Sequence, residues 1–529
     1  MEEINITIKN YRCFTDDTPF KFKLRNGFTA FVGPNNSGKS TSLKFFYELR
    51  QLWEHLRNGN RLLNLTREKI PAGQINIVDA HDQNEIYTTL NERDLFIEFD
   101  FLDYDTTSSI YHISKIELFC DRSKWRANVY YGENSTLLKD GPVSKFAHKN
   151  DLIVNSSEEI KIDCTEFFEF FRKLSNSMYI GSFRNALNQG SVRYFDLNNG
   201  TSFISEWNTW KTGNEKQKNK LIAKVTNDIK NIFRFDTLEI NASAENSTLQ
   251  VIINDDPYKL SEIGSGIAQF IIVLGNIAIK DPHYVFIDEP EQNLHPSLQL
   301  QFLTLIGLYS QSGVLFSTHS IGLARSASDF IYSFNQTNMV TKATELEKTP
   351  NYLQLLGELS YSSYTELGYE KVLFVEGVSD IRTVQQFLRK LKKDHKIVIL
   401  PLGGNALADK NRAHELSEFK RLSPNISVLI DSEKTDKDSD PPNNRTEFYN
   451  LCIQLGFNVC MTKFRAIENY LTDEAIKRAF SSKYLPLKPY QRLEDLDISW
   501  SKNDSWKIAR EMSLHDFMET DLGQFLDSL

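Results

Sequence analysis

Residues 33–41 contain the pattern that most limits what this chain can fold into. They read Gly-Pro-Asn-Asn-Ser-Gly-Lys-Ser-Thr, follow an apolar stretch at 27–32, and lead into a helical pattern that runs through Leu49. A glycine-rich turn between a strand and a helix lets backbone N–H groups surround a phosphate, and the helix N-terminus adds partial positive charge. The sequence therefore predicts an α/β sheet with a nucleotide phosphate bound at this turn.

Individual residues of this turn have separate expected roles. The Lys39 ammonium is expected to reach the β- and γ-phosphates, and the Ser40 hydroxyl is expected to bind magnesium. The other residues of the turn expected to contact the nucleotide are Gly33, Asn36, Gly38 and Thr41.

Two further apolar runs end in residues suited to nucleotide hydrolysis. The run 284–287 is followed by Asp288, expected to hold magnesium, and Glu289, expected to polarise the attacking water. A later run ends near His319, which suits a sensor of the γ-phosphate. An acidic strand end is often only a helix cap, and a lone histidine is usually structural. The occurrence of all three motifs in this order favours an ATP site.

Together these motifs resemble the ABC-type ATPases of the structural-maintenance and recombination-repair branch. The opening stretch 6–14 is similar to the N-terminal strand of that branch, and 260–269 is similar to its signature loop. The loop departs from the usual Leu-Ser-Gly-Gly-Gln and keeps only Gly264, Ser265 and Gly266. In that branch the signature of one subunit caps the nucleotide of another, so the resemblance implies ATP, a composite site and a homodimer.

A second set of acids follows two apolar runs in the C-terminal part. Glu376 directly follows one run, and Asp431, with Glu433 two residues later, follows another. Acids at the ends of neighbouring buried strands are how an α/β domain builds a magnesium site. Glu468 adds another carboxylate, and Asp380 is expected to cap the following helix, to bind metal, or to do both. These residues are the candidate ligands of Mg²⁺ or Mn²⁺.

The stretch 374–380, Phe-Val-Glu-Gly-Val-Ser-Asp, resembles the first motif of Toprim domains. In that family the glutamate acts near the scissile phosphate and a later Asp-x-Asp holds magnesium; here Asp431-Ser432-Glu433 ends in Glu instead of Asp. The turn Leu402-Gly403-Gly404-Asn405 is similar to one seen in the Toprim fold. The resemblance implies that Lys507 steadies the pentavalent phosphate, with Lys502 as a neighbouring competitor for this role.

An ABC-type ATPase followed by a Toprim domain and an Arg-x-Ile-Glu-Asn-Tyr-Leu block at 465–471 resembles the OLD (overcoming lysogenization defect) family of nucleases. The resemblance implies a metal-dependent DNA endonuclease or nickase in bacterial anti-phage defence. It also implies a co-encoded partner, either a helicase-like protein or a retron reverse transcriptase with its RNA–DNA hybrid. Two alternatives stay open: an ATP-dependent DNA clamp that does not cleave, and a topoisomerase- or primase-like enzyme.

The predicted fold class is α/β, with two domains. Residues 1–345 are expected to form the ATPase head, a mixed sheet with an irregular lobe and a helical dimerisation insertion at about 58–235. Residues 346–369 are the predicted linker, and 370–529 the predicted Rossmann-like Toprim domain. Alternation along Ile4–Ile8 predicts an edge strand at the start of the chain.

Composition constrains the cellular location of the protein more than its activity. The net charge is −9, but residues 371–529 hold 24 Lys and Arg and 24 Asp and Glu, so charge neither supports nor excludes a DNA partner. No run reaches the roughly eighteen apolar residues of a membrane span. The acidic N-terminus is not expected to act as a secretory signal, and five scattered cysteines fit a reducing compartment. A cytoplasmic location is predicted.

Overall fold

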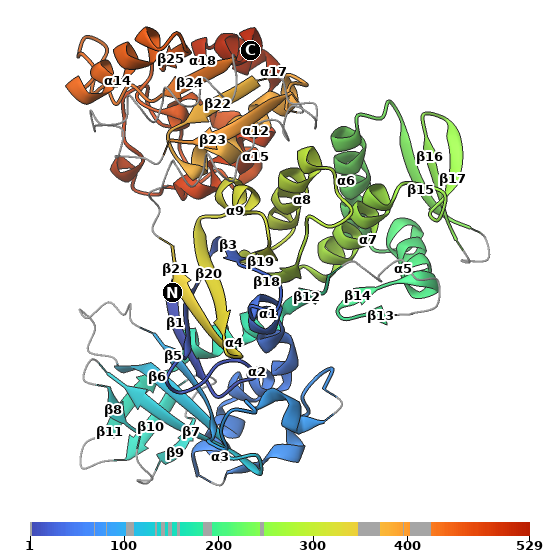
Figure 1. Cartoon of the computed structure of the whole chain (residues 1–529), viewed down its shortest axis with the longest axis vertical. Coiled ribbons are helices and arrows are strands. Elements are labelled where there is room, and N and C mark those ends of the chain that lie inside the picture. The colour runs from blue at the N-terminus through green and yellow to red at the C-terminus, as the bar shows by residue number, and fades with distance from the viewer. Residues whose placement is uncertain are drawn as a thin grey trace. The chain divides into compact units, whose positions relative to one another are not determined.

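Two compact units make up this chain. The computed structural model describes residues 3–67, 69–80, 82–101, 111–132, 135–138, 143–146, 151–155, 159–182, 193–243, 248–346, 371–394, 396–402 and 425–529 (Figure 1). The first unit comprises Met1–Leu294, Leu305–His319 and Tyr332–Leu346, and the second comprises His295–Thr304, Ser320–Ile331 and Glu347–Leu529. The predicted linker beyond Leu346 and the glycines at 403–404 lie outside the described residues.

A ten-stranded sheet occupies the N-terminal part of the first unit. Its main path is β2-β1-β5-β6-β11-β10-β9, and β7 pairs with β6, β4 and β8 beside this path. The strands are β1 (Glu3–Lys9), β2 (Phe20–Arg25), β4 (Ile70–Pro71), β5 (Leu95–Asp100), β6 (Tyr111–Cys120), β7 (Lys124–Tyr131), β8 (Thr136–Leu137), β9 (Val143–Phe146), β10 (Asp151–Asn155) and β11 (Glu159–Asp163). Most of them lie in the region that the sequence predicts to be irregular, which therefore contains more regular sheet than expected.

The expectation that the first strand is an edge strand is wrong. β1 pairs antiparallel with β2 on one side, where Ile6 lies opposite Phe22, and with β5 on the other, where Ile6 lies opposite Phe99. Every second residue of β1 is buried. Such alternation shows that one face of a strand packs on a core, and it carries no information about how many neighbours the strand has.

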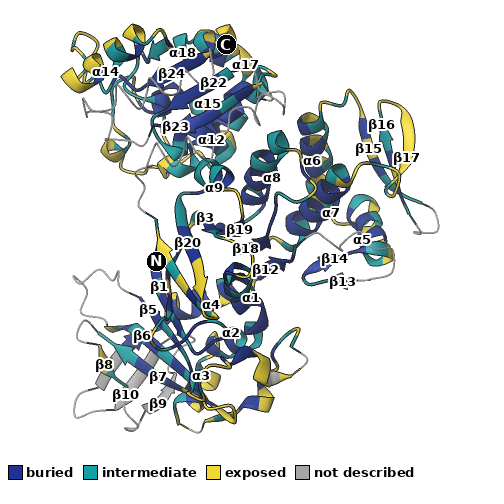
Figure 2. Cartoon of the chain, in the orientation of Figure 1, coloured by how far each residue is buried: buried dark blue, intermediate teal, exposed yellow. Residues whose placement is uncertain are grey.

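A second, six-stranded sheet carries the glycine-rich turn. Its order is β12-β18-β19-β3-β20-β21, with β12, β18, β19 and β3 parallel and β20 antiparallel to β21. The central strands are buried throughout, as expected for a parallel sheet covered on both faces (Figure 2). The strands are β3 (Gly27–Val32), β12 (Ser177–Ile180), β18 (Tyr284–Asp288), β19 (Gly313–Thr318), β20 (Phe330–Thr337) and β21 (Val340–Glu345).

Helices and two small sheets complete the first unit. The stretch predicted to be a helical dimerisation insertion contains α5 (Gly200–Thr212) and α6 (Lys216–Phe233), and its role in dimerisation stays a prediction. The other helices of this unit are α1 (Lys39–Glu48), α2 (Arg50–Leu56), α3 (Gly59–Arg67), α4 (Thr165–Ser175) and α7 (Ser265–Lys280), while α8 (Pro296–Leu308) belongs to the second unit as far as Thr304 and to the first from Leu305. The small sheets are β13 (Arg193–Tyr194) with β14 (Leu197–Asn198), and β15 (Leu238–Ala242) with β16 (Leu249–Ile253) and β17 (Asp256–Lys259).

The second unit is built on a parallel sheet of order β23-β22-β24-β25. Side chains of β22 alternate between two apolar clusters, with Leu373 in one and Phe374 in the other, so both faces of the sheet are buried. The strands are β22 (Lys371–Val375), β23 (Ile397–Pro401), β24 (Ile426–Ile430) and β25 (Asn458–Met461). The helices are α9 (Ile321–Ala327), α12 (Val378–Lys390), α14 (Asn443–Gln454), α15 (Asp473–Ala479), α16 (Ser505–Glu511), α17 (Leu514–Met518) and α18 (Asp521–Ser528).

No helix among the described residues combines the length and the apolar character that crossing a membrane requires.

Candidate functional site

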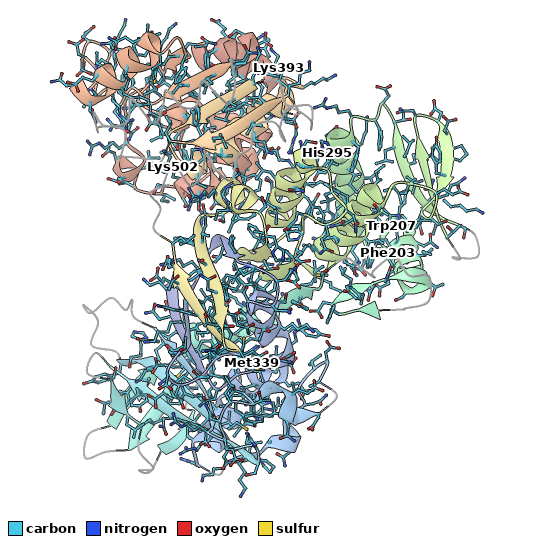
Figure 3. The ribbon with its side chains drawn as sticks, in the orientation of Figure 1. Phe203, Trp207, His295, Met339, Lys393 and Lys502 are labelled. Carbon is cyan, nitrogen blue, oxygen red and sulfur yellow. The ribbon has the colours of Figure 1, made fainter. Side chains whose placement is uncertain are left out.

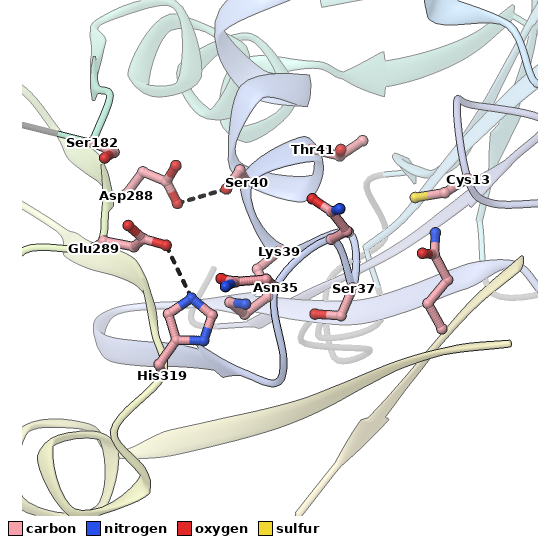
Figure 4. Close-up of a pocket in the computed structure, with 13 residues that line it drawn as sticks. Cys13, Asn35, Ser37, Lys39, Ser40, Thr41, Ser182, Asp288, Glu289 and His319 are labelled. Atoms are coloured by element: carbon pink, nitrogen blue, oxygen red, sulfur yellow. Dashed lines mark hydrogen bonds and ion pairs between the residues drawn. The ribbon is translucent and has the colours of Figure 1, made fainter. Parts of the chain in front are cut away.

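The glycine-rich turn forms one wall of a cavity of about 620 Å³ in the first unit (Figure 4). The turn joins β3 to α1, and Gly38 stands at the helix start with a φ of 95°. A β-carbon at this position would lie 2.9 Å from Thr341 Oγ1, so both the backbone conformation and the space require glycine. The lining residues are Cys13, Asn35, Asn36, Ser37, Gly38, Lys39, Ser40, Thr41, Ser182, Asp288, Glu289, His319 and Gln336.

The side chains expected to hold a nucleotide and its magnesium lie together in this cavity. Lys39 Nζ donates to the carbonyl oxygens of Gly33 and Pro34, each at 2.8 Å. Ser40 Oγ donates to Asp288 Oδ1 at 2.8 Å, and Ser317 Oγ donates to the same carboxylate oxygen. Burial raises the pKa of the Asp288 carboxyl and lowers the pKa of the Lys39 ammonium. The arrangement suits a nucleotide phosphate, which would pair with the Lys39 ammonium, and a divalent cation, which would bind the Asp288 carboxylate.

Polar contacts connect the residues that follow β18 with those at the end of β19, beside the glycine-rich turn. His319 Nε2 lies 3.0 Å from Glu289 Oε1, as the dashed line in Figure 4 marks. Glu291, which the sequence did not single out, accepts from Thr318 Oγ1 at 2.6 Å and from the His319 backbone N–H at 3.1 Å. The acid therefore holds the segment that carries His319. Its only sequence signal is its position three residues after the strand-end Asp288.

The signature loop is not among the residues that line this cavity. Gly264 and Ser265 are exposed and Gly266 is half-buried, at the start of α7. Nothing lies within 4 Å of a β-carbon built on Gly264. Within the described part of one chain, the signature residues thus do not line the cavity that the glycine-rich turn forms.

The acids of the C-terminal set gather at the carboxyl ends of β22 and β24. Glu376 follows β22 and Asp431 follows β24, and the backbone N–H of Asp431 donates to Glu376 Oε1 at 2.8 Å. Asp431 Oδ1 accepts from the backbone N–H of Ile467, which places Glu468 beside it on a short 3-10 helix. Asp380 accepts from the Gly377 N–H at 2.9 Å, so its capping role at α12 is present.

Two cationic side chains lie against these acids. Lys502 Nζ is 3.4 Å from Asp380 Oδ1 and 3.3 Å from Glu468 Oε1; Figure 3 labels this lysine. Arg445 Nη1, from the first turn of α14, is 2.5 Å from Glu376 Oε1. Sequence reasoning gave Lys502 only as a competitor and missed Arg445, because nothing in the local sequence links residue 445 to residue 376.

The structure does not bring Lys507 or Glu433 into this group. Lys507 Nζ pairs with Asp504 at 2.9 Å, and its neighbour Trp506 lies beneath the ammonium. The helical spacing between 504 and 507 makes this local pair the nearer partner. Glu433, which has a φ of 53°, pairs with Arg465. The contacts of the structure therefore join Glu376, Asp380, Asp431 and Glu468 in one group, while a metal-binding role of Glu433 stays a prediction.

Burial and mutual repulsion set the charge state of these acids. Burial raises the pKa of Glu376 to about 7, with Arg445 opposing and Asp380 reinforcing the shift. Burial, followed by repulsion from Glu376, raises the pKa of Asp431 well above its ordinary range, and burial also raises the pKa of Glu468. Attraction to the carboxylates, led by Asp380, raises the pKa of Lys502. Burial and mutual repulsion thus favour the protonated, neutral forms of these acids in the absence of a metal ion.

The group fits a divalent cation by donor type and by charge. Carboxylate oxygens are the ligands that Mg²⁺ and Mn²⁺ favour, and a cation would relieve the repulsion among the buried acids. Among the described residues, no three acids, histidines or cysteines are yet arranged to hold one ion. Lys502 and Arg445 instead contact the carboxylate oxygens of Asp380, Glu468 and Glu376.

This charge state predicts how pH affects the stability of the second unit. A carboxyl whose pKa is raised on folding holds extra protons in the folded state, so stability falls as pH rises from about 4.5 to about 7. Glu376 and Asp431 repel each other, so both carboxyls contribute to this loss. We expect the protection factors of the β22 and β24 amides, which are corrected for the intrinsic exchange rate at each pH, to be lower at about pH 8 than at about pH 5 in EDTA, and Mg²⁺ to raise them mainly at the higher pH.

Glu376→Gln is the matched control for this prediction. Glutamine cannot titrate, so the part of the pH dependence that Glu376 causes is expected to disappear. An equal pH dependence in this variant would assign the effect to other groups.

Comparison with known proteins finds a matching family for residues 28–325. The family model described as "AAA domain, putative AbiEii toxin, Type IV TA system" matches residues 28–325, a span that includes the glycine-rich turn, Asp288 and His319. No curated protein matches the sequence. Among solved structures, the SMC head domain from Thermotoga maritima is 14% identical, covers 66% of this chain and 100% of its own, and gives a TM-score of 0.34. The Smc head domain with an extended coiled coil, bound to the C-terminal domain of ScpA, from Pyrococcus furiosus is 11% identical, covers 68% and 100%, and gives 0.35. Because the family model spans more than half of the 529 residues, the chain belongs to the family described as AAA domain, putative AbiEii toxin, Type IV TA system.

Proposed function

We propose that this protein is a metal-dependent DNA endonuclease or nickase whose activity an ABC-type ATPase domain controls. The observation that carries the proposal is the group of buried acids at the ends of β22 and β24, with the Lys502 ammonium among them. Carboxylates at adjacent strand ends, combined with a lysine, form a donor set suited to metal-assisted phosphodiester hydrolysis. The resemblance of residues 374–380 to the first motif of Toprim domains, a fold shared by topoisomerases, primases and some nucleases, supports chemistry on a nucleic-acid phosphate.

The proposed chemistry assigns a role to each side chain. Glu376, Asp380, Asp431 and Glu468 would hold Mg²⁺ or Mn²⁺, which would supply electrophilic activation of the phosphodiester. Lys502, whose side chain is 45% exposed, is accessible to a phosphate and would offset the negative charge that develops on it. Burial of the acids keeps water from weakening these electrostatic interactions.

The proposed control rests on the first unit. Lys39, Ser40 and Asp288 would hold ATP and its magnesium, while Glu289 and His319 would act at the γ-phosphate. The exposed signature residues Gly264 and Ser265 are free to reach the nucleotide of a second copy, which favours a homodimer with composite sites. A retron reverse transcriptase with its RNA–DNA hybrid, or a helicase-like protein, is the class of co-encoded partner that the OLD resemblance suggests, in an anti-phage role.

The test is incubation of the full-length protein with supercoiled plasmid and Mg²⁺ or Mn²⁺, with and without ATP. We expect conversion to open-circular or linear DNA in the presence of the metal and none with EDTA. ATP is expected to change the rate, and a Lys39→Ala variant is expected to lose this effect of ATP. ATP-dependent DNA binding without any strand cleavage would instead identify a clamp. Incorporation of nucleotides, or relaxation of the plasmid without a nick, would identify a primase- or topoisomerase-like enzyme.

A further inference from the structure

Arg445 is the side chain in the acid group that the proposed chemistry leaves without a role. Its guanidinium lies 2.5 Å from Glu376 Oε1, and the side chains of the two residues are 9% and 11% exposed. The same oxygen accepts the backbone N–H of Asp431 at 2.8 Å. A carboxylate oxygen has two lone pairs in its plane, so these two donors use the hydrogen-bonding capacity of Oε1.

This contact opposes the binding of a metal ion. A cation that binds Glu376 through Oε1 must displace the guanidinium. A cation that binds through Oε2 comes close to a fixed positive charge in a buried setting, where repulsion is poorly screened. In either case, Arg445 and a divalent cation compete for one carboxylate.

A phosphodiester offers the guanidinium another partner. Arginine presents a planar set of N–H donors that matches the oxygens of a phosphate, and it remains charged at every relevant pH. Arg445 is the third residue of α14, so it extends from the helix end whose partial positive charge favours anions. A nucleic-acid backbone at the acid group would therefore meet Arg445 with suitable charge and geometry.

We propose that Arg445 couples metal entry to nucleic-acid binding: its guanidinium holds Glu376 in the free protein and transfers to a phosphate oxygen when DNA binds, which frees Glu376 for the metal ion. This inference rests on the proposed function, because it takes DNA as the ligand of the acid group. Arg445 acts through Glu376 and is a positioning residue. The device would keep the metal site incomplete until substrate is present.

The test measures metal binding directly, without relying on cleavage. The full-length protein, carrying Asp288→Asn to remove metal binding at the nucleotide site, is titrated with Mn²⁺ at about pH 8, because protons compete less with a metal for its ligands as pH rises. The titration is repeated with a short phosphorothioate duplex. We expect the duplex to tighten Mn²⁺ binding about tenfold, the factor that corresponds to 1.4 kcal/mol of coupling between two ligands.

Arg445→Gln and Arg445→Lys separate the effect of the positive charge of Arg445 from the effect of its planar set of N–H donors. Gln removes the competing charge, so Mn²⁺ binding without DNA is expected to tighten about tenfold and the duplex to add less than about twofold. Lys keeps the charge but not the planar donor set, so it is expected to suppress metal binding while showing weaker coupling. Arg478→Gln, which changes a 47% exposed arginine of the same unit, is the matched control and is expected to behave like the parent.

The outcomes distinguish this inference from the proposed function. Unchanged or weaker Mn²⁺ binding in Arg445→Gln, or equal Mn²⁺ binding by the parent with and without the duplex, overturns the role of Arg445. Hydrogen exchange of β22 and β24 in each variant shows whether the unit is folded, and Arg445→Lys provides the test if Gln unfolds it. Coupled metal binding in a protein that never nicks plasmid would retain the role of Arg445 and reject cleavage. Nicking without coupling would do the reverse.

Discussion

Glu376→Gln is expected to lower plasmid nicking about a thousandfold and to leave ATP binding unchanged. The amide keeps the size of the side chain but removes one negative charge from the metal-binding group, and a loss of about 4 kcal/mol of transition-state stabilisation corresponds to this factor. Glu376 belongs to the second unit and does not line the nucleotide cavity of the first, so the substitution removes no contact with ATP. Nicking is measured as the initial rate of open-circle formation, and ATP binding by titration with a fluorescent analogue.

Glu474→Gln is the matched control for this prediction. Its side chain is 80% exposed in the same unit, and the substitution is chemically the same. We expect its nicking rate to stay within about twofold of the parent, because an exposed acid loses little by amidation. Nicking by Glu376→Gln at the parental rate would remove this acid from the reaction and with it the main support for the proposed site.

The features that the sequence predicts well are those in which adjacent residues carry the whole signal. A parallel strand covered on both faces is apolar along its length, so the runs before Asp288, Glu376 and Asp431 stand out. The acid that ends each run then lies at the edge of a sheet. The glycine-rich turn also has a local signal. Glycine is needed at position 38 because of its positive φ and because a β-carbon there would be too close to a neighbouring side chain.

The features that the sequence does not predict depend on residues far apart in the chain. Arg445 reaches Glu376 across 69 positions, and Lys502 reaches Asp380 across more than a hundred, so no spacing rule connects them. Glu433 has the expected type and spacing for a metal ligand, yet a local turn and Arg465 direct it elsewhere. The same holds for the fold. The sequence of 58–235 has no clear periodicity, yet it contains strands such as β6, which pairs with β5 and β7.

Arg382→Ala is expected to lower the free energy of unfolding of the second unit by about 3–5 kcal/mol. Arg382 lies on α12, and its Nη2 is 2.5 Å from Asp329 Oδ1, which follows α9 in the same unit. The two side chains are 1% and 4% exposed. Removing the guanidinium takes a positive charge away from a buried carboxylate, and the poorer compensation of that charge is the expected cost. Urea unfolding, followed by hydrogen exchange of α12 amides, measures the change.

Two further variants separate charge from packing in this prediction. Arg478→Ala removes an arginine that is 47% exposed and lies 3.9 Å from Glu474, so its expected cost is below about 1 kcal/mol. Arg382→Leu combined with Asp329→Leu removes both charges, and is expected to recover most of the loss because no buried charge is then left uncompensated. If the double variant is as unstable as Arg382→Ala, the loss comes from the volume and hydrogen bonds of the arginine. α12 also carries Asp380, so a double variant that is stable but no longer binds metal would show that the ion pair positions the acid group.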